Sequence, residues 1–275
     1  MVNNIVISAS SDIGFEFIKD RSSKGEKIIG TYRDKKSKNK IEKFCAESIY
    51  LDLFEKLSIK EFLGIIKNKN IHWDKILFCP CQPYPYKSFF ECDFEEWNES
   101  FNLNTIKQLE LLHNLYQFRK INSKVVFFAG GGSNSAVDKF SAYTSAKIHL
   151  TKMVELLDFE NKDISFSILG PGWVKTKNHL LALKYADKKS DKYITTKRFL
   201  ESPNGDTPIE EVIRSINWIF EQEKIVVGGR NFSTAFDPWD ESDSSNSILV
   251  DRLKKDFNIY KLRRFGNDLF PNKRY

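Results

Sequence analysis

The segment Asn4-Ile-Val-Ile-Ser-Ala-Ser-Ser-Asp-Ile-Gly14 contains a strand, a turn and the beginning of a helix. The run Asn4–Ser8 is short, apolar and rich in β-branched residues, which is typical of a buried strand. Residues Ser10–Asp12 carry the polar side chains that cap helices, and the helix after them is expected to run to about Ser23. A strand followed directly by a helix is the first unit of an α/β sheet.

Strands and helices continue to alternate along the chain. Further strands are expected at residues 27–32, 48–51, 75–79, 124–128, 164–169 and 225–228. Helices are expected at residues 58–67, 94–119 and 140–159, and a last one opens with Thr207 as its cap and Pro208 in its first position. About seven strands joined by crossover helices predict a Rossmann-type, doubly wound parallel sheet.

The chain shows no Pro/Gly/Ser-rich linker and no internal repeat, so a single domain is expected. Residues 1–233 are assigned to a nucleotide-binding catalytic domain, and residues 234–275 to a C-terminal extension that contributes to a substrate pocket or a subunit contact. The segment 173–206 is expected to form a mobile flap beside the site.

Composition points to a cytoplasmic globular protein. The net charge is +6, but 37 acidic residues are interspersed among 43 basic ones, which argues against a nucleic-acid-binding surface. No segment resembles a signal peptide or a membrane span. The four cysteines suit reduced cytosolic thiols, and the pair Cys79 and Cys81 lacks the second Cys/His pair of a metal site.

The spacing of Tyr143 and Lys147 places both side chains on one face of the predicted helix 140–159. A phenol is a poor acid or base at neutral pH, but a nearby ammonium favours the phenolate and lowers its pKa. The pair could therefore exchange a proton with a carbonyl or alcohol oxygen. Tyr-x-x-x-Lys also occurs by chance on solvated helices, so its surroundings decide what it means.

Those surroundings resemble the short-chain dehydrogenases/reductases over nearly the whole chain. Ser8-Ala-Ser-Ser-Asp-Ile-Gly14 is similar to the glycine-rich turn of that family, although only Gly14 keeps a glycine. Trp97 followed by Asn104 matches the family pattern that places an asparagine in the catalytic tetrad. The resemblance implies an NAD(P)-dependent oxidoreductase in which Tyr143, Lys147 and Asn104 are catalytic.

The resemblance also implies how a nicotinamide cofactor is bound. The residues expected to contact it are Ser8, Ser10, Ser11, Asp12, Ile13, Gly14, Arg33, Asp52, Lys147, Pro171, Gly172 and Thr176. Asp12 is expected either to add charge near the phosphates or to cap its own helix. Arg33, at the end of the second strand, favours NADPH because a basic residue there pairs with the 2′-phosphate. NADH is the less favoured alternative, because Asp34 beside Arg33 could accept hydrogen bonds from the adenosine ribose hydroxyls.

The fourth catalytic residue of the family is displaced in this chain. The serine that polarises the substrate carbonyl lies about thirteen residues before the tyrosine, and that position holds Gly130. We predict Ser133 in this role, with Ser135 or the backbone amides of the glycine run as alternatives. The Asn-Asn-Ala-Gly that follows the fourth strand in the family is replaced around Cys79-Pro-Cys81.

The resemblance implies that the substrate is a small carbonyl or alcohol compound. The tail, including Arg230, Arg263 and Arg264, resembles some bacterial members associated with surface-polysaccharide synthesis, which would suit an anionic or sugar-derived substrate. Subunit contacts are the alternative role of these arginines. A homodimer or homotetramer is expected, with no nucleic-acid or membrane partner. The alternative functions are a degenerate member of the fold with a sensing or structural role, and a nucleotide-sugar epimerase or dehydratase.

Overall fold

The computed structural model describes residues 2–132, 135–239 and 245–264. Its strands are β1 (Asn3–Ile7), β2 (Lys27–Tyr32), β3 (Glu47–Tyr50), β4 (Trp73–Phe78), β5 (Arg119–Phe128), β6 (Ile164–Gly170) and β7 (Arg230–Ser233). Within the described ranges these strands form one sheet in the order β3-β2-β1-β4-β5-β6-β7, and every neighbouring pair is parallel. The predicted doubly wound α/β fold is confirmed.

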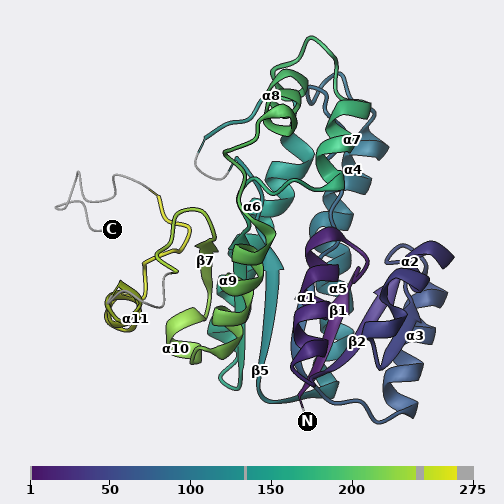
Figure 1. The fold of residues 1–275 in the computed structure, drawn as a ribbon, viewed down its shortest axis with the longest axis vertical. Helices are drawn as coiled ribbons and strands as arrows, with labels where there is room; N and C mark the ends of the chain where they lie inside the picture. Colours follow the sequence, from purple (N-terminus) through teal and green to yellow (C-terminus); the bar gives the residue numbers. More distant parts are fainter. Residues whose placement is uncertain (1, 133–134, 240–244, 265–275) are drawn as a thin grey trace, which may run out of the picture.

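Helices cover both faces of the sheet (Figure 1). One face carries α3 (Lys56–Asn68), α5 (Lys107–Leu115) and α6 (Ser141–Glu160). The other face carries α1 (Asp12–Ser23), α2 (Lys35–Ile41), α9 (Ile209–Glu221), α10 (Lys224–Val227) and α11 (Ser245–Lys255). The strands are buried on both faces, which explains why their sequences are nearly continuous apolar runs.

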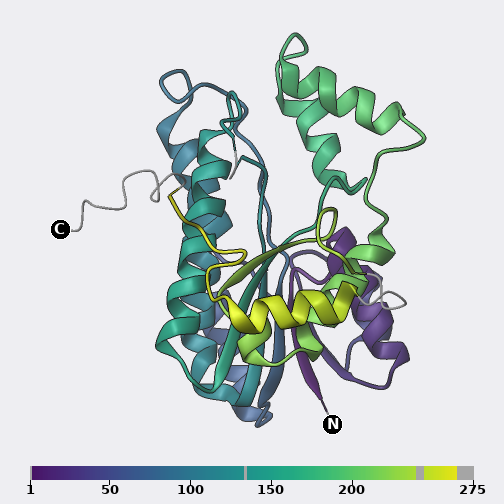
Figure 2. The ribbon, with the colours of Figure 1, turned by 90° about the vertical axis from the view of Figure 1, so that its left-hand side faces the viewer.

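The C-terminal extension packs on the same core. Figure 2 shows α11 lying across the β7 side of the sheet, where Leu249 and Leu253 are buried in the apolar cluster that α1 and α9 also form. The guanidinium of Arg230 in β7 donates to the backbone oxygens of Leu253, Asp256 and Ile259. This arginine therefore holds the segment after α11 against the sheet.

The prediction of a last strand at residues 225–228 was wrong. Residues 224–227 form the short helix α10, and the final strand is Arg230–Ser233 instead. A short apolar run cannot be distinguished from one turn of buried helix by periodicity. Gly229 then turns the chain into β7 with a positive φ of 71°.

Two helix predictions also need correction. The predicted helix 94–119 is α4 (Phe94–Phe101), a π-helical turn η2 (Asn102–Ile106), α5 and a 3-10 turn η3 (Tyr116–Phe118). Thr207 is not a cap, because α9 begins after Pro208 and has no side-chain cap. Helix α2, with a second 3-10 turn η1 (Glu42–Phe44), was not predicted.

The segment predicted as a flap is mostly helical. It contains α7 (Lys177–Tyr185) and α8 (Asp191–Glu201), which lie beyond the carboxyl ends of the strands at the top of Figure 1. None of the helices in the described ranges combines the length and apolar character that a membrane span requires.

Candidate active site

A large cleft opens at the carboxyl ends of the strands, with a cavity volume of about 1080 Å³. It runs past the ends of β1 and β4, which are neighbours in the sheet although β2 and β3 separate them along the chain. Crossovers leave in opposite directions from this point, and open α/β sheets bind ligands at such a place. The cleft is lined by the turn after β1, the end of β2, the start of α6, the segment after β6 and the helices α7 and α8.

The turn after β1 is built for close approach of the backbone. Ser11 caps α1, and its hydroxyl accepts a hydrogen bond of 3.1 Å from the amide of Gly14. A Cβ at Gly14 would lie 2.7 Å from Ser11 Oγ and 3.0 Å from Ser8 O, so only glycine fits. Ser8 adopts a left-handed φ of 58°, where the resembling family has glycine. The strained serine keeps the shape of a glycine-rich turn.

Asp12 points to the flap. Its Oδ2 accepts a 2.8 Å hydrogen bond from the backbone amide of Lys177, the first residue of α7. Neither of the two roles considered from the sequence anticipates this partner, since Ser11 caps α1 and Asp12 caps another helix. The carboxylate therefore joins the turn to the flap.

At the end of β2 the two candidate cofactor residues have separate roles. Asp34 caps α2, with Oδ1 accepting from Ser37 N and Oδ2 from Ser37 Oγ, both at 2.8 Å. These bonds from Ser37 lower the pKa of the Asp34 carboxyl. Arg33 is exposed and lines the cleft. Asp52 does not line the cleft; its carboxylate accepts from the amide of Phe54 in a local turn.

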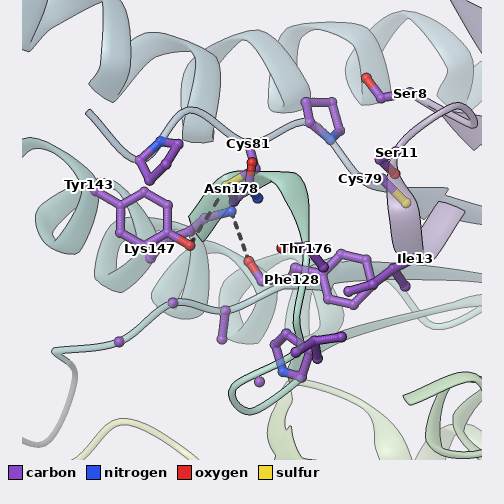
Figure 3. Close-up of a pocket in the computed structure, with 18 of the residues that line it drawn as sticks. Ser8, Ser11, Ile13, Cys79, Cys81, Phe128, Tyr143, Lys147, Thr176 and Asn178 are labelled. Atoms are coloured by element: carbon purple, nitrogen blue, oxygen red, sulfur yellow. Dashed lines mark hydrogen bonds between the residues drawn. The ribbon is translucent and has the colours of Figure 1, made fainter. Parts of the chain in front are cut away.

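Tyr143 and Lys147 lie together on α6 at the floor of the cleft, as predicted (Figure 3). Lys147 is 3% exposed, and its ammonium donates to Phe128 O at 2.9 Å and lies 5.7 Å from the centre of the Tyr143 ring. Burial lowers the pKa of Lys147.

We expected Lys147 to lower the pKa of the Tyr143 phenol, but the surroundings of the phenol have the opposite effect. Burial raises the pKa of Tyr143 well above its ordinary value, and Cys81 raises it further. The Cys81 thiol, on the segment after β4, donates to the tyrosine hydroxyl at 3.9 Å (Figure 3). The surroundings of Tyr143 therefore favour its neutral phenol form.

The position of the family serine has no room for a side chain. A Cβ at Gly130 would lie 2.5 Å from Tyr143 Cε1 and 2.8 Å from Lys147 Cγ. Ser133, our prediction for that role, lies outside the described residues. Ser135, the alternative, is exposed and lines the cleft.

Asn104 is fully buried in the π-helical turn and does not line the cleft. Its amide nitrogen donates to Gln82 O at 2.7 Å and to Ser100 O at 2.8 Å, while its oxygen accepts from Gln82 N at 3.2 Å. The side chain thus fixes the backbone next to Cys81. π-Helical turns are often found at functional sites.

The other predicted cofactor residues surround the cleft. Ser8, Ser10, Ser11, Ile13, Pro171, Gly172 and Thr176 all line it. Gly172 has a φ of 76°, and a Cβ there would lie 2.2 Å from Thr207 Oγ1. Thr207 therefore lies directly against Gly172, and its backbone amide donates to Trp173 O at 2.8 Å.

The sequence predicted a flap beside the site, but it did not identify Tyr86, Phe140 and Lys192 as parts of the same wall of the cleft. Tyr86, Phe140, Trp173, His179 and Lys192 line that part, together with Cys81 and Asn178. These residues come from four distant segments and share no spacing, so only the tertiary structure brings them together.

No model of a known protein family matches the chain, and no curated protein matches its sequence. Solved structures match its fold. A short-chain dehydrogenase/reductase from Saccharomyces cerevisiae is 18% identical with a TM-score of 0.73, over 85% of this chain and 96% of its own. A short-chain dehydrogenase from Shigella flexneri complexed with NADP is 14% identical with a TM-score of 0.71, over 85% and 97%.

An actinorhodin polyketide ketoreductase with NADPH is 16% identical with a TM-score of 0.73, over 84% of this chain and 95% of its own. The chain therefore has the fold of the short-chain dehydrogenases/reductases. Identities this low carry the fold and no more, so the activity of this chain is argued from its own residues.

Proposed function

We propose that the chain is an NADPH-dependent carbonyl reductase of the short-chain dehydrogenase/reductase type. The observation that carries this proposal is the position of Tyr143 and Lys147, adjacent on α6 at the floor of a cleft at the switch point of the sheet. A buried lysine next to a partly buried tyrosine is costly to maintain in a purely structural role. Similar folds bound to NADP and NADPH add support.

The residues of the cleft fit a nicotinamide dinucleotide. The amino end of α1 faces the cleft, and helix N-termini favour phosphate groups. Gly14 allows the backbone to come close, and Arg33 offers a guanidinium for a 2′-phosphate. Since Asp34 is occupied with Ser37, it is poorly placed to accept ribose hydroxyls, which favours NADPH over NADH. When bound, the cofactor would supply the hydride for the carbonyl carbon.

The chain's own residues would handle the proton. Tyr143 is protonated over the neutral pH range and can donate its proton to the carbonyl oxygen as the carbonyl is reduced. The Lys147 ammonium, held by Phe128 O, can then stabilise the phenolate left behind. Asn104 would act as a positioning residue, since it fixes Gln82 beside Cys81.

The substrate oxygen needs a second hydrogen-bond donor besides Tyr143, and Gly130 has no side chain to provide it. Ser135 lines the cleft and supports one assignment. Ser133 stays our prediction from the sequence, with the amides of the glycine run as the remaining alternative.

One observation favours a second candidate function, a degenerate member of the fold that binds nucleotide without catalysis. Tyr143 packs against Gly130 with no serine hydroxyl from that position, and its phenol bonds to Cys81. In that case NADPH would bind without any turnover that depends on Tyr143.

Two of the three arginines that suggested a role in surface-polysaccharide synthesis bond within the chain, and the third, Arg264, is exposed and does not line the cleft. Arg230 is buried and bonds to backbone oxygens, and Arg263 pairs with Glu155 at 2.8 Å. We also propose a homo-oligomer, because Ile106, Leu156 and Phe159 expose apolar side chains on or beside the helices of one face.

The test combines cofactor binding with one substitution. NADPH, and to a lesser extent NADH, should raise the melting temperature of the protein. Tyr143→Phe should keep the NADPH shift and lose NADPH-dependent ketone reduction by about 10²- to 10⁴-fold. No shift with either nucleotide would refute the proposal, and full activity in Tyr143→Phe would refute the role of the tyrosine.

A further inference from the structure

The flap side of the cleft holds a cation among aromatic rings. Lys192, in the first turn of α8, lines the cleft. Its ammonium lies 4.7 Å from the ring centre of Phe140, 5.7 Å from that of Trp173 and 5.8 Å from that of Tyr86. The three rings belong to separate segments of the chain, so the fold gathers them around this one charge.

This ammonium has no carboxylate partner among the described residues. Two other lysines of the flap do: Lys175 lies 3.7 Å from Asp206, and Lys197 lies 3.8 Å from Glu201. Burial lowers the pKa of Lys192, and only the Cys81 thiol opposes that effect. A desolvated cation without an anion is unfavourable, and the faces of aromatic rings compensate for only part of the cost.

A second polar group of the same region also lacks a partner. Nδ1 of His179 in α7 is buried and has no hydrogen-bond partner within the described part of the chain. The histidine lines the cleft, and its ring centre lies 5.7 Å from that of Trp173, the same ring that the Lys192 ammonium approaches at 5.7 Å. The Lys192 ammonium can donate hydrogen bonds to an anion that enters the cleft, and the imidazole lies beside the same aromatic ring.

The position relative to the reacting group is defined by Phe140. The Phe140 and Tyr143 rings have centres 4.7 Å apart, and Lys192 lies at the same distance from Phe140. Phe140 therefore neighbours both the ammonium and the tyrosine ring, and a substrate that reaches both must extend along it. A substrate spanning this distance would carry its anionic group several bonds from its carbonyl, along an apolar middle section that faces Tyr86 and Phe140.

We propose that Lys192, assisted by His179, binds an anionic group of the substrate, so that the chain reduces carbonyl compounds bearing a remote carboxylate or phosphate. This inference rests on the proposed reductase function, which supplies the place of the carbonyl. The anionic group of the substrate would then bind at the flap helix α8, and not at the arginines of the tail.

The test uses two probes of the same shape, 4-acetylbenzoate and its methyl ester. Their binding is measured by calorimetry, both with saturating NADP⁺, which prevents turnover, and without cofactor. The wild-type protein should bind the acid at least about tenfold more tightly than the ester. Lys192→Met, which keeps the apolar stem, should reduce that preference to less than about twofold, and Lys192→Arg should retain most of it.

The matched control is Lys197→Met on the same helix, whose lysine pairs with Glu201 and does not line the cleft. It should keep the full preference for the acid. A third probe, 4-acetylphenyl phosphate, shows which anion is preferred, and its binding should also depend on Lys192. Equal binding of acid and ester by the wild-type protein, or a preference that survives in Lys192→Met, would overturn the inference.

A failure of the proposed anion site can be distinguished from a failure of the proposed reductase function. If the protein reduces the neutral ester with NADPH but shows no charge preference, the reductase function stands and the role of Lys192 is wrong. If NADPH does not bind while the acid is still preferred in a Lys192-dependent way, the anion site stands and the reductase function is wrong.

Discussion

The ring of Tyr143 lies directly against Gly130, so that a Cβ on the glycine would come within 2.5 Å of Cε1. In the family that the sequence resembles, the corresponding position carries the serine that binds the substrate carbonyl together with the tyrosine. In this chain the tyrosine itself occupies the space that a side chain would need. The absence of a side chain at Gly130 thus allows the Tyr143 ring to take this position.

The first prediction concerns this contact. Gly130→Ala should displace the Tyr143 ring and lower kcat/KM for ketone reduction by about 10- to 100-fold, because small misplacements of a catalytic group are costly. Steady-state kinetics with NADPH measure the effect. Gly64→Ala is the control, since a Cβ there meets nothing within 4 Å. Unchanged activity in Gly130→Ala would show that the packing does not position the phenol.

The pH dependence follows from the raised pKa of Tyr143. A proton donor works below its pKa, and burial moves that pKa upward from 10.0. Ketone reduction should therefore keep its rate from neutral pH to at least about pH 10 and fall only above it. Alcohol oxidation needs the phenolate and should rise with pH over the same range. A reduction rate that falls between pH 7 and 9 would contradict a phenol held neutral by burial.

Arg33 should determine the choice of cofactor. A charge-assisted contact with the 2′-phosphate contributes about 1.5–3 kcal/mol, so Arg33→Ala should raise the KM for NADPH by about 10- to 100-fold. The KM for NADH should stay the same. Lys38→Ala, on α2 and away from the cleft lining, should change neither value. An equal loss for both nucleotides would mean that Arg33 does not recognise the extra phosphate.

Asn104 should act on the segment after β4. Asn104→Ala leaves the amide and oxygen of Gln82 without their buried partner, which should lower the free energy of unfolding by about 1–3 kcal/mol. It should lower kcat more than it raises KM, because Cys81 and Tyr143 lose their support. Urea denaturation and kinetics measure the two effects. Asn102→Ala, whose side chain bonds only within α4, is the control.

Arg230 should be structural. Arg230→Met removes the donor to three backbone oxygens and should destabilise the protein by about 3 kcal/mol, with an unchanged KM in the protein that remains folded. Arg263→Met breaks a surface pair with Glu155 and should cost less than about 1 kcal/mol. A large rise in KM for Arg230→Met at full stability would restore its role as a substrate ligand.

Much of the fold could be predicted because its signals are local. The β1–turn–α1 unit depends on an apolar run followed by Ser11, whose hydroxyl caps the helix within three residues. The Tyr143 and Lys147 pair depends on one turn of α6. Predictions failed where a local pattern was ambiguous, as for the short run that forms α10 in place of a strand.

The sequence alone determined the alternation of the first six strands with most of their helices, and the helix face shared by Tyr143 and Lys147, since each depends on neighbours within a few residues. Only the tertiary structure showed that Asp12 caps a helix 165 residues away and that Cys81 meets Tyr143. It also showed that Lys192 lies among three rings, with no carboxylate partner in the part of the chain that the structure describes. Such contacts join segments that are far apart in the sequence. They form only when the whole chain packs, so no residue spacing predicts them.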